Sequence, residues 1–215
     1  SVLFTTFVKT LPPVFENLYD RMPDCVPGAV EFVHIHKLAY QVCRAAGDNP
    51  WVNMSAITEA SKAAFKQVVR AGTPLGDDGI DRSYLEAEVR AVIKGRGIRS
   101  LEEYLKVLRT GRGTRFDPSR RRQAWDYMKE WDAGMAQRDT LDFADTITRA
   151  VEHAQGFTGP WYRAAVIDEA QDLTLMGLQL VRALVNGKRD DDRDDGLLIV
   201  GDGAQRIYPG AFTLR

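Results

Sequence analysis

The sequence has few of the features that mark secreted, disulfide-rich or membrane proteins. It contains only two cysteines, Cys25 and Cys43, without metal-binding spacing, so we expect buried thiols in a reducing compartment. No apolar run reaches the roughly 18 residues that a membrane span needs. The first residues also lack the basic segment of a secretory signal peptide. Together these absences predict a cytoplasmic protein that does not enter a membrane.

An excess of charge of one sign is missing too. Lys and Arg number 29 and Asp and Glu number 30, so the overall charge neither favours nor opposes nucleic acid. We find no internal repeat, and the charged run at 188–195 is interpreted as a solvated loop. Hydrophobic residues make up 44% of the 215, which is enough to form the core of one large domain, with or without an insertion.

Four short apolar runs are typical of buried strands, and they lie at 2–7, 30–35, 164–167 and 197–200. Residues with helical spacing separate them, at 12–22, 37–46, 141–154 and 174–185. Strands that alternate with helices predict an α/β fold with a parallel sheet.

The middle of the chain differs, because it contains helical patterns and no convincing strand. Ser83 with Glu86 and Ser100 with Glu103 have the spacing of a capping box, and Asp117 before a proline predicts the start of a longer helix. We therefore predict an all-α subdomain at 50–138, inserted between two parts of the α/β domain at 1–49 and 139–215.

The sequence DEAQD at 168–172 follows the third apolar run, so a strand delivers two carboxylates to the carboxyl edge of the sheet. Asp168 suits Mg²⁺, which prefers one or two carboxylates plus phosphate and water oxygens. Glu169 suits a group that orients or deprotonates a water molecule. The alternative is an acidic loop that caps the helix beginning near Thr174.

The sequence GDGAQRIY at 201–208 follows the fourth run and ends at the same edge. Its glycines allow a tight turn. Gln205 can reach a γ-phosphate as a neutral donor, with Asp202 on the nucleotide side, and Tyr208 can stack on a base. The alternative is a surface turn on which Tyr208 packs as a lid.

Together, these two segments resemble motif II (the Walker B box) and motif III of UvrD/Rep-type superfamily 1 DNA helicases. Three further segments resemble motifs of this family in the correct order. Thr5, Thr6 and Phe7 resemble motif Ia, whose threonine and phenylalanine meet the DNA strand. His36 stands at the histidine of the next DNA motif, and LDFAD at 141–145 resembles the Asp-Phe segment that precedes motif II.

The resemblance implies part of a RecA-like P-loop NTPase sheet with an inserted helical subdomain. It implies a parent protein that couples ATP hydrolysis to movement on single-stranded DNA and at duplexes. In that protein Asp168 would bind Mg²⁺, and Glu169 and Gln205 would be catalytic residues. Asp202 and Gln205 would contact the nucleotide. The residues expected to bind DNA are Thr5, Thr6, Phe7, His36, Arg112, Arg115 and Tyr208.

Arg112 and Arg115 enter that list because glycines separate arginines in the tract RTGRGTRF at 109–116, a pattern that can follow phosphates. The alternative is a flexible solvated loop followed by the polar first turn of a helix. His36 and His153 have no metal-ligand cluster near them in the sequence, so we expect no metal there.

The sequence departs from the family in three places. Gly203 and Ala204 replace the usual acids of motif III, and His34 stands where threonine is usual. No G-x-x-x-x-G-K-[ST] loop occurs, although this loop cradles the phosphates. We therefore expect an internal piece that is inactive alone. Alternatives are a subunit of a helicase–nuclease, a translocase that strips proteins from DNA, and a non-catalytic DNA-binding module.

Overall fold

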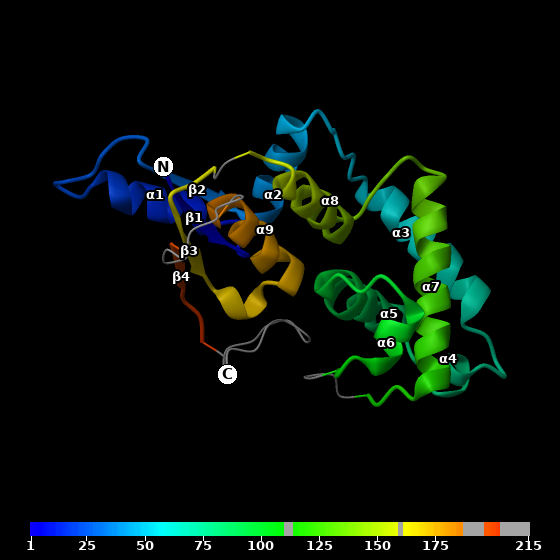
Figure 1. The fold of residues 1–215 in the computed structure, drawn as a ribbon. Coiled ribbons are helices and arrows are strands. Elements are labelled where there is room, and N and C mark those ends of the chain that lie inside the picture. The colour runs from blue at the N-terminus through cyan, green and yellow to red at the C-terminus, as the bar shows by residue number, and fades with distance from the viewer. Residues whose placement is uncertain (110–113, 159–160, 187–195, 203–215) are drawn as a thin grey trace. The chain divides into compact units, whose positions relative to one another are not determined.

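The computed structural model describes residues 1–109, 114–158, 161–186 and 196–202. The chain forms two compact units, which are Ser1–Asn49 with Thr146–Arg215, and Pro50–Asp145 (Figure 1). Among the described residues, no helix is both long and apolar enough to cross a bilayer.

The first unit contains the parallel sheet that the apolar runs predict. Its strands are β1 (Val2–Thr6), β2 (Val30–His34), β3 (Ala164–Asp168) and β4 (Leu197–Ile199), in the order β2-β1-β3-β4 with every pairing parallel. Thr6 pairs with His34 on one side and with Asp168 on the other, so the carboxyl ends of three strands lie level. The predicted α/β class is confirmed.

Alternation along the strands gives the sheet two different faces. Leu3 and Ile167 point into a buried core with α2 (Ile35–Ala45), α8 (Phe143–Gln155) and α9 (Leu175–Asn186). On the other face, Phe4 packs against Phe15 of α1 (Pro12–Asp20), with ring centroids 4.6 Å apart. The strands accordingly lie between α1 and the other three helices in Figure 1.

The second unit is helical, and its described residues contain no strand. Its α-helices are α3 (Met54–Val68), α4 (Pro74–Asp77), α5 (Arg82–Glu88), α6 (Leu101–Lys106) and α7 (Pro118–Ala136). A π-helical turn, Val89–Ile93, and a 3₁₀ turn, Lys94–Arg96, continue α5. Trp131 and Tyr127 of α7 and Tyr104 of α6 are wholly buried and anchor this second core.

The predicted capping box at Ser83 and Glu86 is wrong. Asp81 caps α5 instead, since its carboxylate accepts a hydrogen bond from the Tyr84 N–H at 2.7 Å. Ser83 donates its hydroxyl to the same carboxylate, and Glu86 pairs with Arg82. An aspartate two residues upstream is as good a cap as serine, so it displaces the predicted one.

The other two predicted helix starts are confirmed. Ser100 caps α6 by accepting a hydrogen bond from the Glu103 N–H at 3.2 Å. Asp117 caps α7, whose first residue is Pro118. Both helices begin where a small polar acceptor precedes residues that favour a first turn.

A buried ion cluster joins three segments of the helical unit. The ammonium of Lys94 lies 2.7 Å from an Asp132 oxygen, 3.3 Å from Asp142 and 2.8 Å from Asp145. Burial alone would lower the pKa of Lys94, but the carboxylates outweigh it and raise that pKa. Burial and the Asp142 carboxylate raise the pKa of Asp145 to about 7, against the effect of Lys94. The single ammonium therefore compensates three carboxyl groups.

Candidate functional site

Strands β3 and β4 remain joined beyond their last residues. The Val200 N–H donates to the Ile167 carbonyl at 2.8 Å, and the Ala170 N–H donates to the Val200 carbonyl at 3.0 Å. Asp168 is the last residue of β3, and Asp202 follows the end of β4. Both carboxylates therefore follow the carboxyl ends of neighbouring parallel strands, where open α/β sheets bind ligands.

Glu169 has an unusual backbone for a residue with a side chain. Its φ of 51° and ψ of 41° place it in the left-handed region. For a residue other than glycine this costs about 1–3 kcal/mol, and such strain gathers at functional sites. The strain lies directly between Asp168 and the 3₁₀ turn Ala170–Asp172.

Gln171 links this acidic segment to the turn after β4. Its side chain is buried, its amide nitrogen donates to the Glu169 carboxylate, and its amide oxygen accepts from the Asp202 N–H at 3.1 Å. A Cβ at Gly201 would lie 2.5 Å from that amide oxygen, so a larger residue there would displace the Gln171 amide. Sequence reasoning predicted the turn but missed Gln171, because nothing in its spacing shows which way the amide points.

The model of the UvrD/REP helicase N-terminal domain matches residues 30–210 of this chain. The chain belongs to the UvrD/REP helicase family. No curated protein matches it. Family membership supports nucleotide binding and a DNA-related function, and it makes the parallel sheet that of a RecA-like helicase domain.

The residues predicted to meet DNA beyond β1 and β2 differ in exposure. Thr5 and Thr6 are fully buried, and the Thr5 hydroxyl has no hydrogen-bond partner among the described residues. Phe7 and His36 are partly exposed and lie edge to face, with ring centroids 5.6 Å apart. The structure thus brings Phe7 and His36 together beyond the ends of β1 and β2. Gln205, Tyr208 and Arg112 lie outside the described residues.

His34, which stands where the family usually has threonine, acts as a helix cap, a position for which threonine is suited. It caps α2, because its Nδ1 accepts a hydrogen bond from the Lys37 N–H at 3.4 Å. Burial, and then the charges of Lys9 and Lys37, lower the pKa of His34. A neutral imidazole can accept this hydrogen bond, so the substitution leaves the helix capped and His36 in place.

Three of the described arginines in the tract at 109–116 and in the Arg120-Arg121-Arg122 run that follows it have partners within the helical unit. Arg109 is buried with Glu88, and its Nε lies 2.6 Å from the Glu88 carboxylate. Arg120 pairs with Asp78, and Arg121 donates to the carbonyl oxygens of Tyr104, Leu105 and Val107. Arg115 is exposed. Among the arginines of this tract that the structure describes, Arg115 is therefore better placed for phosphates than these three.

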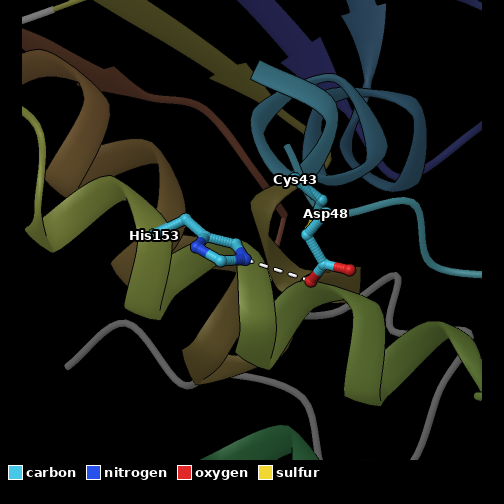
Figure 2. A group of neighbouring side chains, drawn as sticks. All are labelled: Cys43, Asp48 and His153. Atoms are coloured by element: carbon cyan, nitrogen blue, oxygen red, sulfur yellow. Dashed lines mark hydrogen bonds and ion pairs between the residues drawn. The ribbon is translucent and has the colours of Figure 1, made fainter. Parts of the chain in front are cut away.

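Cys43, Asp48 and His153 form a group that the sequence did not predict (Figure 2). Their candidate ligand atoms lie within 4.8 Å of one another. The His153 ring nitrogen is 3.0 Å from Asp48, which Arg149 also faces at 3.4 Å. Burial and the Asp48 carboxylate raise the pKa of the Cys43 thiol to about 11. A metal would have to displace the thiol proton and compete with Arg149, so the group fits an ion pair at the edge of the core better.

Proposed function

We propose that the protein carrying this chain is an ATP-dependent DNA translocase or helicase that moves along single-stranded DNA. The observation that supports the proposal is the pair Asp168 and Glu169 at the carboxyl end of β3, which is hydrogen-bonded to the segment that follows β4. Phosphoryl transfer to water requires a metal ligand and a group that handles the water, and this pair supplies both.

The donor set at this edge fits Mg²⁺. Asp168 is partly exposed at the end of its strand, and Asp202 is exposed nearby, so a cation that keeps phosphate and water oxygens can reach them. Bound there with ATP, Mg²⁺ would neutralise charge on the phosphates. Glu169 would orient the attacking water and accept its proton, and Gln205 would donate a hydrogen bond to the γ-phosphate.

The test is ATP hydrolysis with Mg²⁺, measured with and without single-stranded DNA. We expect DNA-stimulated hydrolysis from the full-length protein, and none above background from residues 1–215 alone, because this sequence has no phosphate-binding loop. Chelation of Mg²⁺ is the control. A full-length protein that binds DNA but never hydrolyses ATP would instead support the non-catalytic alternative.

On the DNA side, we expect Tyr208→Ala to weaken single-strand binding by about 1–3 kcal/mol, because base stacking would be lost. Basal ATP hydrolysis should remain, while its stimulation by DNA falls. Gln205→Ala should have the opposite effect on DNA binding: the affinity for single-stranded DNA should remain, but it should no longer depend on whether nucleotide is bound. Strand affinity of both full-length variants, with and without a non-hydrolysable ATP analogue, checks this. Wild-type affinity in Tyr208→Ala would show that the ring packs as a lid.

A further inference from the structure

We propose that Gln171 is a positioning residue, which holds the Glu169 carboxylate for ATP hydrolysis and ties it to the turn at Gly201 and Asp202. The inference rests on the proposed function, because it gives Gln171 a role only if Glu169 handles the water. It assigns a role to the one amide of the DEAQD segment at 168–172, for which the sequence alone predicted none.

Both ends of the Gln171 amide form hydrogen bonds. The nitrogen donates to Glu169, and the oxygen accepts from the Asp202 N–H at 3.1 Å. The bridge therefore needs a donor and an acceptor at the end of one side chain of this length. Glutamate has no donor when ionised, and methionine has neither a donor nor a strong acceptor.

The residues around Gln171 fit the bridge from Glu169 to Asp202 closely. The Gln171 side chain is buried, with 3% of its surface exposed, so its bonds face little competition from water. Gly201 leaves room for the amide oxygen, which a Cβ would approach to 2.5 Å. The backbone hydrogen bonds of Val200 with Ala170 and Ile167 keep the two segments at a fixed spacing. Glu169 and the turn are therefore held relative to each other through one amide.

For the reaction, the bridge would fix the orientation of the Glu169 carboxylate. Glu169 is partly exposed on a strained backbone, so its carboxylate gains orientation from a bond to a buried partner. In hydrolysis, the water oxygen bonds to the γ-phosphorus, the bond to the leaving ADP oxygen breaks, and the water proton passes to Glu169. Gln171 exchanges no proton and contributes by fixing the acceptor.

The experiment uses the full-length protein with DNA present. We expect Gln171→Met to lower kcat for ATP hydrolysis about 10–100-fold, while KM for ATP changes less than about threefold. In a Glu169→Gln background, the same change should lower the residual rate less than about twofold, because residues that act through one another are not additive. Gln123→Met is the matched control, since Gln123 is a buried amide that bridges the Leu75 N–H and the Val68 carbonyl. It should leave kcat unchanged.

A second variant separates positioning from folding. Gln171→Asn keeps an uncharged amide on a side chain one methylene shorter, so it cannot reach Glu169 and the Asp202 N–H together, and it should lose kcat as Gln171→Met does while thermal unfolding stays close to wild type. The role of Gln171 alone would be overturned if Gln171→Met had the wild-type kcat. It would also be overturned if Gln171→Met lowered kcat by the same factor in the wild-type and Glu169→Gln backgrounds. Near-normal turnover in Glu169→Gln itself would instead remove the proposed function of Glu169, and the role of Gln171 with it.

Discussion

Replacing Glu169 by glutamine in the full-length protein is expected to slow ATP hydrolysis about 10²–10⁴-fold and to leave ATP binding nearly unchanged. The amide has almost the shape of the carboxylate but cannot accept the proton of the attacking water. Asp168, which would hold the cation, is untouched. Single-turnover hydrolysis and the affinity for a fluorescent ATP analogue measure the two quantities separately.

Glu16→Gln is a suitable control for this change. Glu16 is an exposed residue of α1 in the same unit, so the substitution removes one negative charge without altering the sheet edge. It should hydrolyse ATP at the wild-type rate. If Glu169→Gln turned over nearly as fast as this control, another group would have to handle the water.

The second large effect concerns stability. We expect Lys94→Met to lower the free energy of unfolding by about 3–5 kcal/mol, because it removes the ammonium that three carboxyl groups share. Lys106→Met is the matched control, since Lys106 pairs with Glu102 on the surface, where the two side chains are 73% and 78% exposed. An exposed pair contributes only about 0.2–1 kcal/mol. Urea unfolding of the variants measures both changes.

The effect of Lys94→Met should also depend on pH. The pKa of Asp145 is raised from 3.8 to about 7, so between these values the folded protein keeps a proton that the unfolded chain has released. This group therefore makes the wild-type protein less stable as pH rises through that window. Without Lys94 the carboxyl groups repel one another more strongly once ionised, so the loss should be larger near pH 8 than near pH 5. A loss that is equal at both pH values would contradict the assignment of the cluster.

The sequence was sufficient to predict the parallel sheet, because its buried strands are continuous apolar runs. The position of Asp168 follows from the same pattern, since the carboxylate comes directly after such a run. Helix starts were predictable where one candidate cap was present, as at Asp117. At Ser83 the prediction failed because Asp81 caps the helix two residues earlier, which leaves Ser83 inside the first turn.

Contacts between distant segments could not be predicted in this way. The basic tract shows the difficulty, because an arginine that binds phosphate and one that pairs with a buried glutamate look alike in sequence. Arg109 is of the second kind, and its partner Glu88 lies 21 residues away. The bridge made by Gln171 also depends on side-chain packing, which the spacing of motifs does not contain.

The left-handed backbone at Glu169 has a consequence for how such chains evolve. Glycine adopts this conformation without strain, so at this position the residue that best suits the fold is not the one that suits hydrolysis. On the proposed mechanism, selection for catalysis therefore acts against a gain in stability. A lineage that stopped hydrolysing ATP would be free to drift toward glycine or asparagine here. The residue at this position in newly sequenced relatives should therefore indicate whether each of them still hydrolyses ATP.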